Sequence, residues 1–256
     1  MSFREPGYLY NLNVPFIWGP ISGLDNLPKG FFKNIPLSML VKSIVRSFSN
    51  FIQFKFSFRI QRALNKASRI YAVTYTDKYK LSQRNNFVVN LLDVGSKHNT
   101  SFIKDREYNG DRRLKVIWIG RLDYLKALDI LLNAIAQSQL LKDNVEVTIV
   151  GSGPQEEYFI RIAKNLNLKN IKWVGFVEKE QVESLMLDSD LLVHTSIKEA
   201  ASAVILESLS CGLPVVCHDS FGMSHSITND CGRKVPFKTM ENSILGFKDV
   251  IEELIL

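Results

Sequence analysis

The 256-residue sequence has few cysteines and no long apolar segment. Its three cysteines, Cys211, Cys217 and Cys231, form no C-x-x-C pair and show no metal-site spacing with histidine. No run approaches the roughly 18 apolar residues of a membrane span, and the first residues lack the charged start and apolar stretch of a secretory signal. We therefore expect reduced thiols, no metal site and a cytoplasmic location.

Acidic residues are scarce in the first part of the chain. Residues 1–113 contain 18 Lys/Arg and 7 Asp/Glu, a net charge of +11, whereas residues 114–256 contain 14 and 19, a net charge of −5. The overall composition, with 46% hydrophobic and 23% charged residues, is typical of a globular protein with a sizeable core. The uneven charge predicts two units with different partners.

From residue 114 onward, short apolar runs alternate with helical periods, which predicts a mostly parallel sheet covered by helices on both faces. The predicted strands are 114–120, 145–151, 171–176, 190–196 and 213–218. The predicted helices are 123–139, 154–165, 180–188, 202–211 and 239–255. In such a sheet the carboxyl ends of the strands share one edge, where ligands bind.

The first hundred residues predict a different arrangement. A strand running into a Gly/Pro loop is predicted over 13–23, further strands over 68–74 and 86–91, and a long, basic, Phe-rich helical region over 36–66. Residues 96–113 are polar and unpatterned, as linkers are. We therefore predict a partial domain over 1–107 and a complete-looking domain over 108–256.

Two glutamates eight residues apart, Glu199 and Glu207, flank a turn of small residues between a predicted strand and a predicted helix. Glu199 is expected in the loop, and Glu207 about two turns into the helix. Small residues, including Ser202 and Ala203, let the first N–H groups of the helix approach an anion such as phosphate. A carboxylate deeper in the crevice can accept hydrogen bonds from vicinal hydroxyls, as ribose recognition requires. The spacing alone favours a plainer interpretation, a charged first turn with one solvated glutamate.

Two cations, Arg121 and Lys126, follow the strand 114–120 at the opening of a helix. They suit a diphosphate, since Arg offers the bidentate geometry that phosphate prefers. Surface charge beside an amphipathic helix explains them equally well. A glycine-rich turn containing Gly151 follows the next strand, but it has neither GxGxxG nor GK[ST] and indicates little by itself.

Taken in order, several segments resemble the C-terminal domain of the family-4 glycosyltransferases, which have the GT-B fold. They are GRLDYLK (120–126), IVGSGP (149–154), VGFV (174–177) and HTSIKEAASAVILESLSCGLPVV (194–216). NVPFIWGPISG (13–23) is similar to a segment late in the acceptor domain of that family. The resemblance implies an α/β protein with one Rossmann-like nucleotide-sugar-binding domain and a partial second Rossmann-like acceptor domain.

The resemblance also implies residue roles. The E-x(7)-E motif of the family matches Glu199 and Glu207, and its Arg/Lys pair matches Arg121 and Lys126. Glu207 would hold the donor ribose, Glu199 the transferred sugar, and the two cations the departing diphosphate, while the backbone at Phe176–Val177 borders the base. We expect catalytic roles for Glu199, Arg121 and Lys126, and donor binding at Glu207, Ser202, Ala203, Val177 and Gly151.

The implied activity is retaining transfer of a hexose from a nucleoside diphosphate sugar to a glycan or lipid-linked acceptor in polysaccharide assembly, without a cofactor or metal. In this family retention is attributed to front-face departure and attack, so no protein nucleophile is named. The alternative is a non-catalytic donor-binding or interaction protein derived from such an enzyme by truncation. A sugar-nucleotide epimerase of similar fold is disfavoured by the E-x(7)-E segment.

The sequence departs from the family pattern in several places. Ala200 and Ser202 stand where the family usually has glycine, and Ala127 stands where glycine follows the lysine. The early glycine-rich loop and the catalytic-site histidine of the family would lie upstream of Met1, and its closing helix beyond Leu256. We therefore expect a chain truncated at both ends.

The segment Asp188-Ser189-Asp190 looks like a D-x-D metal motif. Its position, where a helix meets a buried strand, argues against a metal site there. His194 is expected in the core or the crevice rather than as a base.

The segment 29–69 is basic and aromatic. No acidic residue lies between Asn26 and Thr76, where nine Lys/Arg are interleaved with phenylalanines. Such a stretch suits an anionic membrane surface, so we expect peripheral association with the inner membrane face. The alternative is a helix pair whose phenylalanines fill the core. No RNP, helix-turn-helix or zinc pattern supports nucleic-acid binding.

Overall fold

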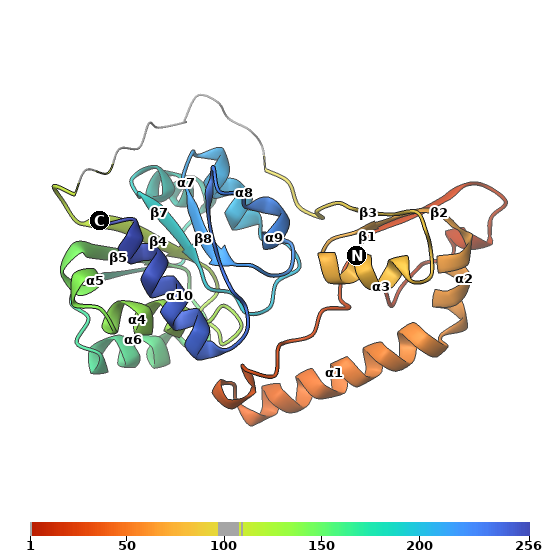
Figure 1. Cartoon of the computed structure of the whole chain (residues 1–256), viewed down its shortest axis with the longest axis horizontal. Helices are drawn as coiled ribbons and strands as arrows, with labels where there is room; N and C mark the ends of the chain where they lie inside the picture. The colour runs from red at the N-terminus through yellow and green to blue at the C-terminus, as the bar shows by residue number, and fades with distance from the viewer. Residues whose placement is uncertain (1, 97–107, 109) are drawn as a thin grey trace. The chain divides into compact units, whose positions relative to one another are not determined.

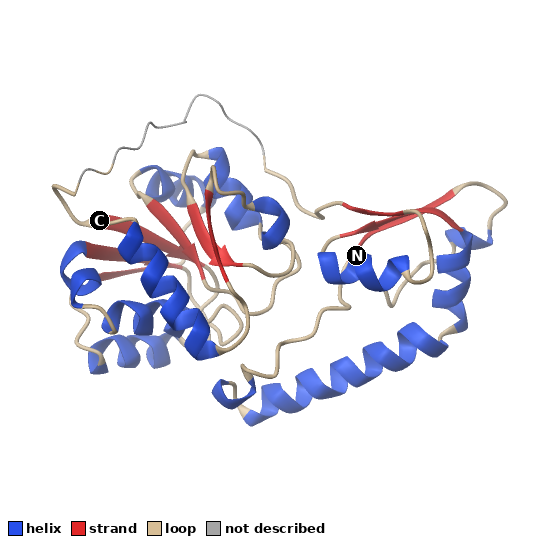
Figure 2. Cartoon of the chain, in the orientation of Figure 1, coloured by secondary structure: helices blue, strands red, loops and turns tan. Residues whose placement is uncertain are grey.

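The computed structural model describes residues 2–96, 108 and 110–256. They divide into two compact α/β units (Figures 1 and 2). The first unit comprises residues up to Gly95 together with Glu199–Ser202, and the second comprises Ser96–Lys198 and Ala203–Leu256. The predicted boundary at 107–108 and most of the predicted linker lie outside the described residues.

The first unit contains a parallel sheet of three strands in the order β1–β2–β3. Its strands are β1 (Phe16–Ile21), β2 (Ala67–Ala72) and β3 (Val88–Asn90). Its helices are α1 (Leu37–Phe56), α2 (Phe58–Lys66) and α3 (Tyr75–Ser82), with short 3₁₀ helices η1 (Leu9–Asn11) and η2 (Phe32–Asn34). The helical region predicted over 36–66 is therefore two helices that meet at Ser57. Helix α3 was not predicted, because its sequence YTDKYKLS shows no apolar period.

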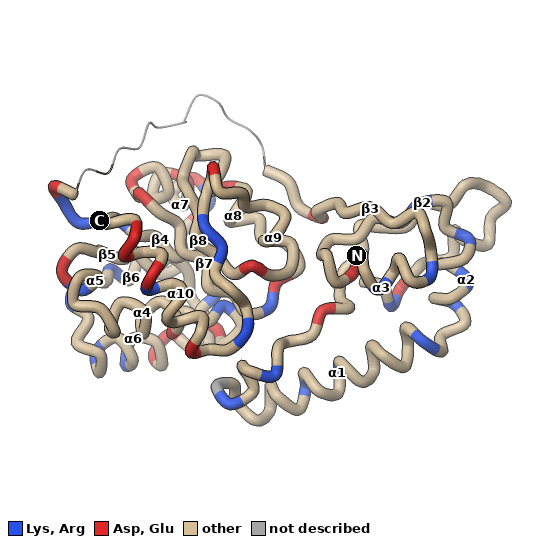
Figure 3. Tube along the Cα trace, in the orientation of Figure 1, with Lys and Arg blue, Asp and Glu red and all other residues tan. Residues whose placement is uncertain are grey.

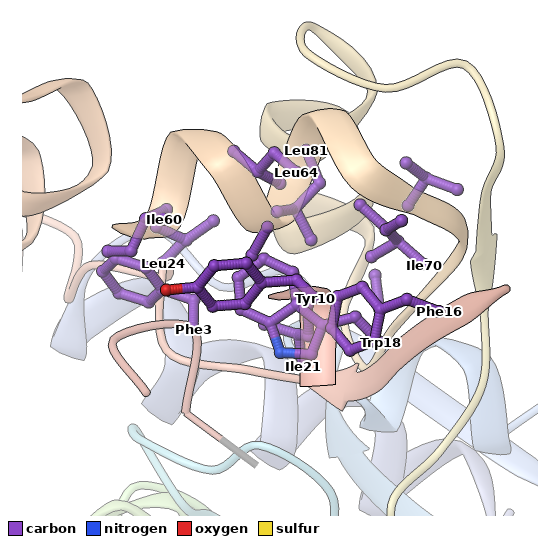
Figure 4. Close-up of a cluster of buried hydrophobic side chains, with 14 residues drawn as sticks. Phe3, Tyr10, Phe16, Trp18, Ile21, Leu24, Ile60, Leu64, Ile70 and Leu81 are labelled. Atoms are coloured by element: carbon purple, nitrogen blue, oxygen red, sulfur yellow. The ribbon is translucent and has the colours of Figure 1, made fainter. Parts of the chain in front are cut away.

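The core of the first unit is formed by side chains of the sheet and of the helices that follow its strands (Figure 4). Trp18 and Ile21 of β1 belong to the same buried cluster as Ile60 and Leu64 of α2. Gly19 has a φ of +140°, and a Cβ there would lie 2.5 Å from the carbonyl oxygen of Tyr71. Glycine at this position therefore allows β1 to lie close to β2.

The second unit contains a parallel sheet of six strands in the order β6–β5–β4–β7–β8–β9. Its strands are β4 (Leu114–Ile119), β5 (Val145–Val150), β6 (Ile171–Gly175), β7 (Leu191–His194), β8 (Val215–His218) and β9 (Gly232–Val235). This is the strand order of a doubly wound Rossmann fold, in which the winding direction reverses between β4 and β7. The predicted parallel α/β architecture is confirmed.

Helices cover both faces of this sheet (Figure 1). Helix α10 (Met240–Glu253) contacts α4 (Leu128–Ala136) and α5 (Gln139–Asn144), and α4 also contacts α6 (Glu156–Asn165). The remaining helices are α7 (Lys179–Leu187), α8 (Ala203–Ser210) and α9 (Met223–Ser226). The prediction of one helix over 123–139 was wrong, since Ala127 has a left-handed backbone (φ 49°, ψ 49°) and α4 begins only after it. Among the described residues, no helix combines the length and the apolar character needed to cross a bilayer.

Candidate functional site

The carboxyl ends of β4, β5 and β6 are joined by backbone hydrogen bonds. The amide of Gly120 donates to Val150 O (3.0 Å), and the amide of Gly151 donates to Gly175 O (2.8 Å). Gly151 has a φ of +124°, and a Cβ there would lie 2.0 Å from the carbonyl oxygen of Gly120. Glycine at 151 is therefore required for the close approach of two strand ends. Its predicted part in donor binding remains a prediction.

The loop between β4 and α4 carries Arg121 and Lys126. The Asp123 carboxylate shapes this loop by accepting hydrogen bonds from the amides of Leu125 (2.9 Å) and Lys126 (3.1 Å). Nε of Arg121 lies 3.7 Å from Oδ2 of Asp123, and the Arg121 side chain is 69% exposed. The guanidinium is thus tethered only loosely and stays accessible to an anion from solvent.

Three hydrogen bonds join this loop to the residues that follow β7. The hydroxyl of Thr195 donates to Lys126 O (2.8 Å), and the hydroxyl of Ser196 donates to Leu125 O (3.2 Å). The amide of Ile197 also donates to Leu125 O (2.8 Å). Because β4 and β7 are the strands at which the winding reverses, the Lys126 loop lies at the point where doubly wound sheets bind ligands.

The segment Glu199–Ser202 connects these residues to α8. Glu199 is half-buried and Ser202 is buried. Helix α8 begins at Ala203, so Glu207 is its fifth residue and lies little more than one turn from the start. The prediction of two turns was therefore wrong, because small polar and apolar residues mark the first turn of a helix poorly.

Glu207 forms an ion pair that no sequence pattern predicted. Nζ of Lys179, the first residue of α7, lies 3.4 Å from Oε1 of Glu207. Both residues line a cavity of about 200 Å³ whose other walls include Glu183, Met186 and Ser210. Ligand pockets usually span about 300–1,000 Å³, so this cavity has room for part of a ligand, such as a ring. Its sequence signal was a cation shortly after the strand 171–176, the same arrangement that singled out Arg121.

The loop between β6 and α7 contains Phe176 and Val177. Val177 packs against the core of the second unit, whereas the side chain of Phe176 is 73% exposed. The backbone of this loop leads directly into Lys179. The predicted base contact of Phe176–Val177 therefore falls next to the side chain that pairs with Glu207.

Most of the predicted site residues belong to loops at one edge of the sheet. Arg121 and Lys126 follow β4, Gly151 follows β5 and Val177 follows β6. Ala203 and Glu207 lie in the helix that follows β7, and these four strands are neighbours in the order β6–β5–β4–β7. The structure therefore brings these residues to one edge of the sheet, as the sequence predicted, while their part in a site remains a prediction.

The sequence of the second unit matches a known protein family. Residues 100–254 match the family described as "Glycosyl transferases group 1". The chain belongs to this family. Its two parallel α/β units are those of the GT-B fold, as in similar solved glycosyltransferase structures.

Similar proteins and solved structures align with part of this chain. An uncharacterized glycosyltransferase of Methanocaldococcus jannaschii is 27% identical over 121 residues, which are 47% of this chain and 31% of that protein. TuaC of Bacillus subtilis, a putative teichuronic acid biosynthesis glycosyltransferase, is 28% identical over 173 residues, 64% of this chain and 42% of that protein. The match thus spans less than half the length of these curated relatives. The Anabaena protein HepE, solved with UDP and glucose, has a TM-score of 0.56 at 21% identity, covering 85% of this chain and 66% of that one.

Two histidines, His194 and His218, end strands of the second sheet, and both are buried. His218, at the end of β8, is fully buried, with Nδ1 3.1 Å from Ser196 O and Nε2 2.9 Å from Oγ of Ser243. One neutral tautomer satisfies both contacts, with Nδ1 donating and Nε2 accepting. Burial lowers the pKa of His218 to about 3, so the ring is neutral at physiological pH. His194 is also buried, as the sequence predicted.

The acidic segment 188–190 lies at the amino end of β7, on the edge opposite to the site. Asp190 accepts hydrogen bonds from Nη2 of Arg112 (2.7 Å) and from the amide of Lys115 (2.8 Å). Burial raises the pKa of Asp190, but these bonds outweigh it and hold the pKa below its usual value. Asp190 therefore joins the amino end of β7 to the amino end of β4. Among the described residues, no group of three or more His, Cys, Asp and Glu has the arrangement of a metal site.

Proposed function

We propose that this chain contributes the donor site of a retaining glycosyltransferase that moves a hexose from a nucleoside diphosphate sugar to a glycan or lipid-linked acceptor. The observation that carries the proposal is the attachment of the Lys126 loop to Thr195–Ile197 at the reversal point of the sheet. It holds a cation-bearing loop next to the chain segment that leads to Glu199. A diphosphate leaving group needs such preorganised positive charge.

In this proposal each site residue has a separate task. Arg121 and Lys126 neutralise the departing diphosphate, and the carboxylate of Glu207 accepts hydrogen bonds from the ribose hydroxyls. Lys179 limits the freedom of the Glu207 side chain through its ion pair, and Glu199 faces the transferred sugar. The donor is the only small molecule required, with no further cofactor.

The acceptor is proposed to be a growing glycan or a lipid-linked sugar in polysaccharide assembly. The similarity to TuaC, a putative teichuronic acid biosynthesis glycosyltransferase, supports this class of acceptor. A lipid-linked acceptor would also place the chain at the inner face of a membrane, which we propose as its working location. The UDP present in the HepE structure makes UDP the first nucleotide to test.

The proposal is tested by thermal-shift titration of the chain with UDP, GDP, ADP and their common sugar conjugates. One base is expected to raise the melting temperature. Glu207→Ala and Arg121→Ala are each expected to weaken its binding by roughly tenfold or more, because each removes a charged hydrogen-bonding group. Glu180→Ala and Lys142→Ala, on helices of the same unit, are the matched controls. No shift with any nucleotide would overturn the donor site.

Transfer is tested separately, with the base that binds and its sugar conjugates. Release of nucleotide, with an α-linked product from an α-linked donor, would support a retaining enzyme. Binding without transfer or donor hydrolysis would favour the alternative, a non-catalytic donor-binding protein.

A further inference from the structure

Helix α1 is attached to its unit by polar residues. Asn50 is the buried residue of this 20-residue helix. Its Nδ2 donates to Gly23 O (2.8 Å), and its Oδ1 accepts from Nε of Arg4 (2.9 Å). The hydroxyl of Ser47 donates to Oδ1 of Asn26 (2.9 Å), while Phe54 packs against the core. An amphipathic helix on a globular domain normally buries its apolar face instead.

The outward face of α1 is apolar. We call this face the apolar strip, and its members are each 40–74% exposed: Leu37, Val41, Ile44, Val45, Phe48, Phe51, Ile52 and Phe56. At about 100° per residue these side chains fall within one sector of about 140°. Contiguous apolar surface of this extent marks an interaction site. The second sequence interpretation, in which the phenylalanines of this region fill the core, holds for the buried Phe31 and in part for Phe54, but not for the strip.

Every charged residue in the sequence around the apolar strip is basic. No Asp or Glu lies between Asn26 and Thr76, and Figure 3 shows Lys and Arg but no acidic residue along α1 and α2. Lys55 rises from the strip itself, with Nζ 5.7 Å from the ring centre of Phe51 and 5.4 Å from that of Phe56. A partner that covers the strip must therefore be apolar in its interior and negative at its surface.

A cavity beside the strip is lined by both basic and apolar side chains. Its lining includes Arg4, Lys42 and Arg46 together with Val41 and Val45 of the strip, around a volume of about 540 Å³. Small-molecule sites usually span about 300–1,000 Å³, so an organic phosphate fits. Three cations beside an apolar wall match a phosphate joined to an acyl chain.

We propose that α1 binds an anionic phospholipid surface, with the apolar strip among the acyl chains and Arg4, Lys42 and Arg46 against lipid phosphates. The proposal rests on the proposed membrane location but not on the donor chemistry. It assigns the contact to one face of one helix, with Lys55 extending toward the headgroups in the way that long cationic side chains do.

A second copy of the chain is the competing occupant of the strip. Leu37, Val41, Ile44, Phe48 and Phe51 have the 4-3 spacing of a helix-pairing seam. Pairing of two α1 helices through this seam would, however, bury Lys55, which lies in the same sector beside Phe51, with no acidic residue on the helix to balance its charge. Anionic lipid supplies that balance, so the charge pattern favours the membrane.

The test is co-sedimentation of the chain with vesicles of phosphatidylcholine and phosphatidylglycerol, compared with phosphatidylcholine alone. The chain is expected to partition at least about tenfold more strongly onto the anionic vesicles, and added salt should weaken this binding. Phe48→Ser combined with Phe51→Ser, and Lys42→Glu combined with Arg46→Glu, should each lower the partition coefficient by about tenfold or more. All four side chains are exposed, so circular dichroism should show an intact fold.

The controls separate this surface from others on the chain. Phe176→Ser and Lys172→Glu change an exposed aromatic and an exposed cation in the second unit and should leave vesicle binding unchanged. Equal binding to neutral and anionic vesicles, or no binding, would overturn the proposal. So would a wild-type dimer in sedimentation equilibrium that Phe48→Ser with Phe51→Ser dissociates. Nucleotide titration of the two α1 double variants reports on the donor site independently, because none of their four residues is among the site residues.

Discussion

The hydroxyl of Thr195 donates a hydrogen bond of 2.8 Å to the backbone carbonyl of Lys126. The same hydroxyl accepts one of 3.0 Å from Nε1 of Trp118, and both side chains are buried. Thr195→Val preserves shape but removes the hydrogen bonds to the part-buried Lys126 carbonyl and to the buried indole N–H of Trp118. We expect a loss of about 2–4 kcal/mol in the free energy of unfolding, measured by urea denaturation, since each such group costs about 1–3 kcal/mol.

The same variant also tests whether the Lys126 loop must be held in place. Nucleotide binding to Thr195→Val should weaken, because the loop loses one of its attachments to β7. Thr148→Val, on β5 of the same sheet, is the control. Unchanged nucleotide affinity in a destabilised Thr195→Val protein would show that the hydrogen bond serves the fold and not the site.

Substitution by alanine should lower the melting temperature by different amounts at two glycines that lie at the ends of neighbouring strands. Both have positive φ, +124° at Gly151 and +77° at Gly175, so both substitutions cost backbone strain of about 1–2 kcal/mol. A Cβ at 151 would in addition lie 2.0 Å from Gly120 O, whereas nothing lies within 4 Å of one at 175. Gly151→Ala should therefore melt well below Gly175→Ala in a thermal scan. Equal melting temperatures would mean that the strand ends can separate at little cost.

Ala127 occupies a backbone conformation that favours glycine. Its φ of 49° and ψ of 49° place it in the left-handed region, where a non-glycine residue pays about 1–2 kcal/mol. Ala127→Gly should raise the free energy of unfolding by about 0.5–1 kcal/mol, after loss of one buried methyl group. Ala134→Gly, inside α4, should lower it by about 1 kcal/mol and is the control. Destabilisation by both substitutions would contradict the assignment of strain to Ala127.

Stability should fall as the pH rises from about 4 to about 6. Burial and the neighbouring Asp25 raise the pKa of Asp77 from 3.8 to about 6. The hydroxyl of Thr74 lies 2.6 Å from Oδ2 of Asp25 and 2.8 Å from Oδ2 of Asp77, and its single proton serves one carboxylate at a time. The folded state therefore binds a proton more tightly than the unfolded state, and the stability that this proton contributes is lost as the pH increases through this window.

The substitution Asp77→Asn mimics the protonated acid and should flatten this part of the pH profile. The shift of about two pKa units corresponds to roughly 3 kcal/mol, measured by denaturation across the window. Burial likewise raises the pKa of Asp129 to about 6, so a smaller slope should persist in the variant. Asp143→Asn, at an exposed position, is the control. A wild-type profile that is flat between these pH values would contradict the raised pKa values.

The strands of the second unit were predictable because buried parallel strands read as continuous apolar runs. Val145–Val150 and Leu114–Ile119 coincide with the predicted strands to within one residue at either end. Strand β9 was not predictable in this way. Its sequence GRKV contains one apolar residue with a side chain, Val235, and it is a strand because it pairs with β8.

Residues of the candidate site were predictable where a charged side chain follows the end of a predicted strand. Arg121, Lys126 and Glu207 lie at the expected edge for that reason. Lys179 was missed because its partner Glu207 lies 3.4 Å away across a helix pair, which no local pattern records. The phenylalanines of α1 left two alternatives open for a similar reason, since a helical period shows that a face is apolar but not what it contacts.

The hydrogen bond from the amide of Ile197 to Leu125 O joins two loops that are distant in sequence. Such a bond breaks only when both loops open together, so the two should fluctuate as one unit. Deuterium uptake at Ile197 would then slow when an anion binds near Arg121, although Ile197 carries no reactive group. Mass-spectrometric exchange at this single amide would therefore follow occupancy of the neighbouring loop.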